Sequence, residues 1–177
     1  MASAVLLACC GAAFTARVHH AAASGRTVSS TARALLRGEI VRYERATWNW
    51  ERVMGAPRTE TAGRMLAQMS GSDVQQALGL WQRRAEAARR RAQRPPHLKA
   101  WLCIHRYEAA WTDAGAPYYG GLQMNLSFQQ HYGRRLLQQK GTADHWTPLE
   151  QMWTAEKALR SRGFWPWPNT ARYCGLL

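Results

Sequence analysis

One carboxylate in this chain stands out because of the residues around it. Glu108 follows Trp101, Ile104 and His105 at helical spacing, in a mostly apolar segment. Apolar neighbours favour the neutral, proton-carrying form of a carboxyl group, which a general acid needs. Residues 118–123 (Tyr-Tyr-Gly-Gly-Leu-Gln) begin ten positions later, and they combine flat aromatic faces with two flexible glycines and a polar amide. This combination predicts a groove that binds a sugar and protonates it.

A second acid would decide between two kinds of chemistry. Glycosidases usually place two carboxylates across the scissile bond. Asp113 is the acid that follows Glu108 most closely, and it falls in an expected loop. A hydrolase is possible if Asp113 faces Glu108. If it does not, Glu108 must act alone.

The elements around Glu108 can be predicted from caps and breakers. A helix over about residues 97–110 carries Glu108, and a loop or short hairpin over 112–121 follows. Asn125 is a cap for a further helix that ends near Lys140, before a glycine. Glu108 is therefore expected inside a helix, beside the loop that carries the tyrosines.

The next helix carries two more glutamates. Thr147 and Glu150 have the spacing of a capping box around a helix-start proline, so Glu150 is expected to cap this helix rather than do chemistry. The helix should end at Gly163. Glu156 is expected to pair with Arg160, four residues on. Residues 164–168 (Phe-Trp-Pro-Trp-Pro) cannot be helix interior, and they either form a wall of the cleft or plug the helix bundle.

The N-terminal half predicts three helices. The first runs from about Ser30 to Gly55, the second covers residues 61–69, and the third starts at Ser72, which has capping-box spacing to Gln75. Prolines 95 and 96 end the third helix and mark a domain boundary.

Residues 24–31 are expected to be a flexible linker that leads into a basic helical extension. The third helix of this extension has an arginine-rich face opposite its apolar stripe, which leaves the role of residues 30–95 open. The favoured interpretation is an ordinary packed stripe with a solvated basic face. The region is otherwise a helical hairpin that packs against the C-terminal domain, a tether to a cell wall or membrane surface, or a dimerising helix.

The N-terminus has features of an export signal. Residues 4–14 are apolar, and residues 21–23 (Ala-Ala-Ala) offer a cleavage site, so residues 1–23 are expected to be removed. The apolar run is too short to span a bilayer, and no other stretch is long and apolar enough to do so. Cys9 and Cys10 would be lost with the signal. Cys103 and Cys174 remain as an even pair in an exported protein, and we expect them to form a disulfide.

The charge of the chain predicts an anionic partner but does not indicate which kind. The formal net charge is +13, which attracts nucleic acid, anionic membranes and anionic cell walls alike. No base-reading motif is present, so no specific nucleic-acid partner is expected. The sequence also lacks the zinc motif HExxH, the nucleotide motif GxxxxGK[ST] and the nucleophile motif GxSxG, so neither a cofactor nor a metal is expected.

Residues 98–177 resemble a known family. The shared residues are Glu108, residues 118–123, Glu150-Gln151, Ala155-Glu156-Lys157, Gly163, Trp167-Pro168 and Cys174. They resemble the transglycosylase-like domain of resuscitation-promoting factors, within the lysozyme and lytic-transglycosylase superfamily. The resemblance implies a mainly α, lysozyme-like domain over residues 96–177. This chain departs from the family in having Ala109-Ala110 after the glutamate and a shorter loop before the tyrosines.

The resemblance also implies an activity. Lytic transglycosylases use one glutamate, first as acid and then as base on the sugar's own 6-hydroxyl, so Glu108 is the expected catalytic residue. Tyr119 and Gln123 are the expected glycan contacts. The other candidate substrate-binding residues are Tyr118, Gly121, Trp111 and Trp167. We therefore expect a secreted, cell-wall-associated enzyme that cleaves the MurNAc-GlcNAc bond of peptidoglycan and has other cell-wall hydrolases as potential partners. The alternative is a non-catalytic glycan-binding module on the same fold.

Overall fold

The computed structural model describes residues 29–61, 63 and 68–177, and this part of the chain is mainly α-helical, as predicted. The predicted signal (residues 1–23), with Cys9 and Cys10, and most of the predicted second helix (residues 61–69) lie outside the described residues. The elements are α1 (Ser30–Met54), α3 (Gly71–Ala92), α4 (Leu98–Tyr107), β1 (Tyr118–Tyr119), β2 (Met124–Asn125), α5 (Leu126–Tyr132), α6 (Arg134–Lys140), the 3₁₀ turn η1 (Ala143–His145), α7 (Pro148–Arg162) and α8 (Pro168–Tyr173). No helix in the described part combines the length and apolarity needed to cross a membrane.

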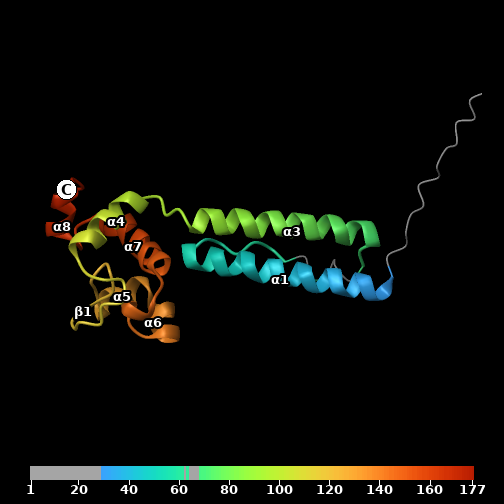
Figure 1. The fold of residues 1–177 in the computed structure, drawn as a ribbon, viewed down its shortest axis with the longest axis horizontal. Helices are drawn as coiled ribbons and strands as arrows, with labels where there is room; N and C mark the ends of the chain where they lie inside the picture. Colours follow the sequence, from blue (N-terminus) through green and yellow to red (C-terminus); the bar gives the residue numbers. More distant parts are fainter. Residues whose placement is uncertain (1–28, 62, 64–67) are drawn as a thin grey trace, which may run out of the picture.

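Helices α1 and α3 lie side by side as a long hairpin that projects from a C-terminal helical body (Figure 1). Helix α1 ends where predicted, because Gly55 adopts a left-handed conformation (φ 66°). Helix α3 begins earlier than predicted. Its capping box joins Ser70 to Asp73, rather than Ser72 to Gln75, because an aspartate at the third helical position can bond back to the cap.

The hairpin has its own core and a second, smaller cluster where it meets the body. Ile40, Val74 and Trp81 are buried between α1 and α3. At the junction, Trp153 of α7 packs with Met54 and Ala92, and its indole Nε1 donates a hydrogen bond to the Ala92 carbonyl at 2.7 Å. This geometry is that of a helical hairpin packed against the C-terminal body. A tethering or dimerising role for it stays a prediction.

Trp167 of the aromatic segment 164–168 plugs the core of the C-terminal body, whereas Trp165 is 63% exposed. The Trp167 side chain is only 4% exposed and its Nε1 donates to the Leu122 carbonyl at 2.6 Å. Its ring meets those of Trp101 and Phe128. This body is built around the buried residues Trp101, Ile104, Leu122, Met124, Phe128, Ala143, Trp146, Met152, Ala155, Ala158, Trp167 and Ala171.

Two local predictions for this body were wrong. The helix that Asn125 caps breaks at Gly133, whose backbone leaves the helical range (φ −124°) and packs closely on Trp146: a Cβ on Gly133 would lie 2.5 Å from the indole ring. Glu156 is buried and accepts hydrogen bonds from His97, the N-cap of α4, and from Trp101 within α4. It is not paired with Arg160, whose side chain is exposed. In both places a tertiary contact overrides a local pattern.

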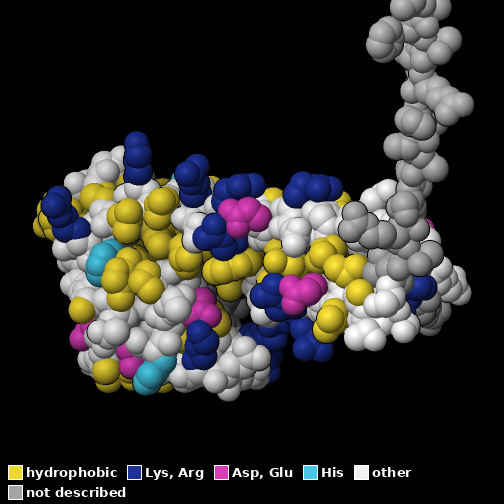
Figure 2. Space-filling view, turned by 45° about the vertical axis from the view of Figure 1, so that its right-hand side comes forward, with side chains coloured by type: hydrophobic (Ala, Val, Ile, Leu, Met, Phe, Trp, Pro, Cys, Tyr) yellow, Lys and Arg dark blue, Asp and Glu magenta, His cyan; other side chains and the backbone are white. Residues whose placement is uncertain are grey.

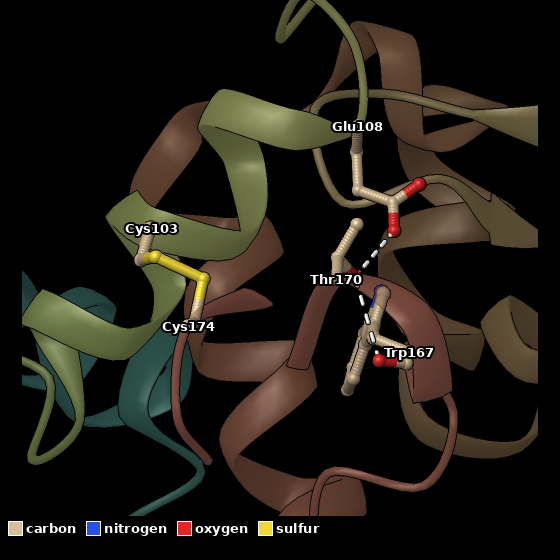
Figure 3. Close-up of a disulfide and its surroundings, with 5 residues drawn as sticks. All are labelled: Cys103, Glu108, Trp167, Thr170 and Cys174. Atoms are coloured by element: carbon tan, nitrogen blue, oxygen red, sulfur yellow. Dashed lines mark hydrogen bonds between the residues drawn. A yellow bond between two sulfur atoms is a disulfide. The ribbon is translucent and has the colours of Figure 1, made fainter. Parts of the chain in front are cut away.

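The predicted disulfide is present. Cys103 of α4 is bonded to Cys174, just after α8, with a Cα–Cα distance of 6.0 Å (Figure 3). The crosslink joins residues 71 positions apart, so it fixes the C-terminal tail against the helix that leads to Glu108.

Removing this crosslink should lower the stability of a chain that comprises residues 24–177. The loop-entropy relation gives an upper figure of about 4 kcal/mol for a closed loop of this length. We expect Cys103→Ala/Cys174→Ala to shift the urea unfolding midpoint downward. Adding a reductant should shift the wild type by a similar amount and leave the variant unchanged. A wild-type midpoint that does not respond to reductant would contradict the disulfide.

Candidate functional site

Glu108 lies at the very end of α4 rather than inside a helix. It is the C-cap residue of α4, which ends at Tyr107, and its side chain is half-buried. The Thr170 hydroxyl of α8 donates a hydrogen bond to Glu108 Oε1 at 2.8 Å (Figure 3). The other oxygen, Oε2, accepts no hydrogen bond from the residues that the structure describes. One oxygen is therefore held in place, and the other keeps its capacity to accept a hydrogen bond.

Thr170 is a site residue that sequence reasoning missed. Its side chain is 7% exposed, and its hydroxyl also lies 3.4 Å from the Trp167 carbonyl. It is 62 positions from Glu108, so no local spacing connects the two. The available signal was indirect: Thr170 lies close before Cys174, which was expected to be crosslinked to the helix carrying Glu108.

The tyrosines and Gln123 lie in a small hairpin, whose Gly121 carbonyl is 3.2 Å from His105 Nδ1 on α4. Strands β1 and β2 pair antiparallel, with Tyr118 opposite Asn125 and Tyr119 opposite Met124. Gln123 sits in the turn with a left-handed backbone (φ 47°). Tyr119 is half-buried against the core, while the Tyr118 side chain is 48% exposed.

Asp113 is tied to this hairpin through Gln123. Its Oδ2 accepts a hydrogen bond from Gln123 Nε2 at 2.7 Å, and its carbonyl accepts one from the Gly120 amide at 2.7 Å. Gln123 Nε2 also donates to the Gly120 carbonyl at 3.0 Å. Asp113 therefore holds the loop in shape. The Gln123 amide nitrogen is used within the loop, which leaves its carbonyl oxygen for a ligand.

The two glycines of the hairpin turn serve internal packing. A Cβ added to Gly121 would lie 2.6 Å from both His105 Nδ1 and the Trp111 ring. A Cβ on Gly120 would lie 2.5 Å from Gln151 Oε1. Trp111 stacks on His105 with ring centroids 4.0 Å apart. Gly121 and Trp111 were both expected to contact substrate. Instead, they pack against each other and His105, and so hold the hairpin turn in position.

A groove of about 430 Å³ runs along the hairpin, and three of the expected substrate contacts line it: Tyr118, Gln123 and Trp167. The other lining residues are Met124, Asn125, Ser127, Phe128, His131, Tyr132, Arg162 and Pro166. Glu108 is not part of the lining. It is connected to the groove through Thr170, which contacts Trp167 as described above.

Comparisons with family models, with curated proteins and with solved structures find no match for this chain. What the site does must therefore be inferred from its own residues. Among the residues described, no group of three or more His, Cys, Asp or Glu side chains is arranged to hold a metal ion.

The tight packing at Gly121 gives a direct test of the hairpin's position. Gly121→Ala should destabilise the protein by about 1–3 kcal/mol, because the new methyl group must displace the stacked His105 and Trp111 rings. The control is Gly38→Ala, in the middle of α1, where nothing lies within 4 Å of the added Cβ. That change should stabilise the helix by about 0.5–1 kcal/mol. Equal unfolding midpoints for the two variants would show that Gly121 is not enclosed.

Proposed function

We propose that this protein is a secreted lytic transglycosylase that cleaves the MurNAc-GlcNAc bond of peptidoglycan, with Glu108 as its single acid and base. The observation that carries the proposal is the state of the Glu108 carboxyl group. It is half-buried at a helix end, one oxygen is held by Thr170, and the other has no partner among the described residues. A proton-transfer group needs a fixed orientation and an oxygen that is not already engaged by the protein.

The reaction needs only this one carboxyl group. Protonated Glu108 gives its proton to the glycosidic oxygen, and the bond from that oxygen to C1 of N-acetylmuramic acid breaks. The Glu108 carboxylate then takes the proton from the 6-hydroxyl of the same sugar as O6 bonds to C1. The products are a 1,6-anhydro ring and a free sugar hydroxyl, Glu108 regains its proton, and no water is consumed. Throughout, the Thr170 hydroxyl keeps the carboxyl group in one orientation.

The position of Asp113 favours this scheme over hydrolysis. A retaining or inverting hydrolase needs a second carboxylate that acts on the sugar or on water beside the first. Asp113 Oδ2 accepts a bond from Gln123 Nε2 and its carbonyl accepts one from the Gly120 amide, and among the described residues no hydrogen bond joins Asp113 to Glu108 or Thr170. Its role in holding the loop gives it a structural reason to be present without any chemistry.

The groove provides surfaces that suit a glycan chain. The exposed Tyr118 ring offers a face for sugar stacking. Gln123 and Asn125 offer polar groups for hydroxyls, and Arg162 offers a positive charge for the carboxylates of peptidoglycan stems. The strongly basic chain and the apolar N-terminal run further support an exported protein that works at an anionic cell wall.

Glu108→Gln is the decisive variant. It keeps the shape of the side chain and an oxygen that can accept the Thr170 hydrogen bond, but it removes the proton-transfer group. We expect release of anhydro-muropeptides from purified peptidoglycan to fall by about 10²–10⁴-fold, measured by mass spectrometry of the digest.

Asp113→Asn is the matched control. Its amide oxygen can still accept the bond from Gln123, so activity should stay within about tenfold of the wild type. Reducing-end products without the anhydro ring, lost in Asp113→Asn, would instead indicate a hydrolase. No release by the folded wild type, together with retained glycan binding, would favour the non-catalytic glycan-binding module.

A further inference from the structure

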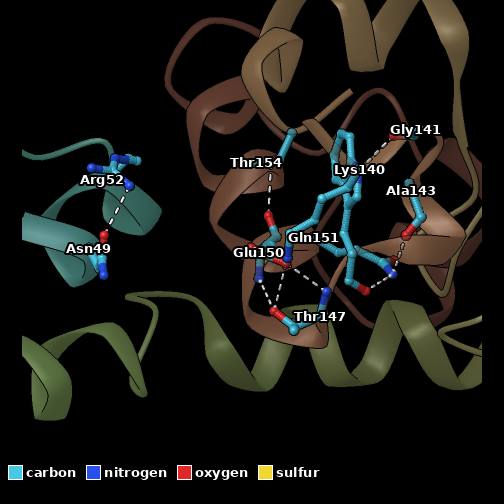
Figure 4. A network of polar contacts seen from close by, with 10 residues as sticks. Asn49, Arg52, Lys140, Gly141, Ala143, Thr147, Glu150, Gln151 and Thr154 are labelled. Carbon is cyan, nitrogen blue, oxygen red and sulfur yellow. Dashed lines mark hydrogen bonds and ion pairs between the residues drawn. The ribbon is translucent and has the colours of Figure 1, made fainter. Parts of the chain in front are cut away.

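A second pocket, of about 460 Å³, lies between the hairpin and the C-terminal body. The end of α1 contributes Asn49, Arg52 and Val53, and the body contributes residues of α6 and α7, including Lys140 and Glu150. Figure 4 shows Asn49 and Arg52 on α1, joined by a hydrogen bond of 2.9 Å, and Lys140 and Glu150 on the body. The volume falls within the range of about 300–1,000 Å³ that is typical of small-ligand sites.

The walls of this pocket are strongly cationic. Five basic side chains line it, and Glu150 is the only carboxylate among the lining residues; the basic residues are Arg52, Arg134, Arg135, Lys140 and Lys157. Figure 2 shows Lys and Arg side chains near the junction of the hairpin and the body, with Asp and Glu side chains beside some of them.

Glu150, the single carboxylate, already has hydrogen-bond partners within the protein. Lys140 Nζ lies 2.7 Å from both oxygens of Glu150, and the Thr147 amide and hydroxyl donate to the same group. Burial alone would raise the pKa of Glu150, but the hydrogen bonds from Lys140 and Thr147 outweigh it, and its pKa lies below the ordinary value. Glu150 is therefore ionised and neutralises one lysine. The other four cations remain uncompensated by it.

Lys157 is the most confined of these cations. It is half-buried, and its side chain passes beneath the end of α1, with Cε 2.9 Å from the position of a Cβ on Gly55. Burial, followed by the charge of Arg160, lowers the pKa of Lys157. Lys157, Arg134 and Arg135 have no carboxylate partner among the residues described. A bound anion would relieve both the mutual repulsion of these charges and the desolvation of Lys157.

We propose that this pocket is a binding site for phosphate groups, sized for a short run of a phosphate polymer rather than for a single ion. Arginine guanidinium groups form two-pronged hydrogen bonds to phosphate, and lysines add point charges. Several uncompensated cations favour a ligand with more than one negative charge over a single carboxylate. The proposal does not rest on glycan cleavage, because none of the pocket's cationic residues is placed in the reaction at Glu108; the pocket shares only His131 and Tyr132 with the groove.

The position of the site has a structural consequence. Arg52 belongs to the hairpin, whereas Arg134, Arg135 and Lys157 belong to the body. An anion held between them adds a link across the junction, alongside the contact of Trp153 with Ala92. Binding should therefore stabilise the junction as well as retain the protein on its ligand.

Tripolyphosphate is the probe for the test, because it carries the proposed chemistry in a small molecule. Titration calorimetry at 0.15 M salt should detect binding by the mature Glu108→Gln protein as well as by the wild type. Arg52→Gln/Arg135→Gln should weaken it by about tenfold or more. The matched control, Arg45→Gln/Arg91→Gln, removes the same charge from exposed positions on α1 and α3 that lie outside this pocket. It should change the affinity by less than about twofold, since surface charges at a distance are screened. Equal loss in both variants, or no binding by the wild type, would overturn the proposal.

Lys157 gives a second, independent readout. The anion prefers the protonated amine, so affinity should fall as the pH rises through the lowered pKa of Lys157 in the free protein. Lys157→Gln should abolish this pH dependence.

A poly(glycerol phosphate) oligomer and phosphatidylglycerol vesicles distinguish the sources of phosphate. Binding of either through Arg52 and Arg135 identifies the ligand as polymer or headgroup, whereas vesicle binding without tripolyphosphate binding would contradict a phosphate pocket.

Discussion

The buried carboxylate of Glu156 is the constraint around which the C-terminal body is arranged. A charge taken out of water must be met by hydrogen-bond donors, or the fold loses several kcal/mol. Here the donors are the His97 amide and the Trp101 indole, each at 2.8 Å, with the His97 ring at 3.0 Å. These contacts fix the start of α4 against α7. Because α4 is a short helix, fixing its start also determines where its end, and with it Glu108, is placed.

Other side chains of α7 use the same principle toward different segments. Gln151 Nε2 donates to the carbonyls of Trp111 and Ala143, both at 2.8 Å, which attaches the loop before the hairpin. Trp153 attaches the end of α3. Helix α7 is therefore a central helix whose polar side chains donate hydrogen bonds to backbone carbonyls in segments that are distant in sequence. Helix α7 contributes Arg162 to the groove and Glu150 and Lys157 to the cationic pocket, and the two share His131 and Tyr132 in their linings.

What could be predicted from the sequence was what neighbouring residues decide. The capping box of Thr147 and Glu150, the cap at Asn125 and the stop at Gly55 depend on bonds within a few residues, and all three are present. The disulfide followed from the number of cysteines left after the expected signal. In contrast, the Thr170 contact, the break at Gly133 and the partner of Glu156 are each decided by residues far along the chain. Spacing carries no information about those contacts, and knowledge of the fold is needed to see them.

The hairpin also determines a length. Helix α1 has 25 residues, which at the usual rise per residue corresponds to about 37 Å. Its C-terminal end is held at the body by Met54, and its N-terminal end lies at the far tip (Figure 1). With α3 packed along it, the pair is a stiff spacer rather than a flexible tether. Anything attached at the tip would be kept at a nearly constant distance from the body. The body could then change its direction from the attachment point but not its distance from it.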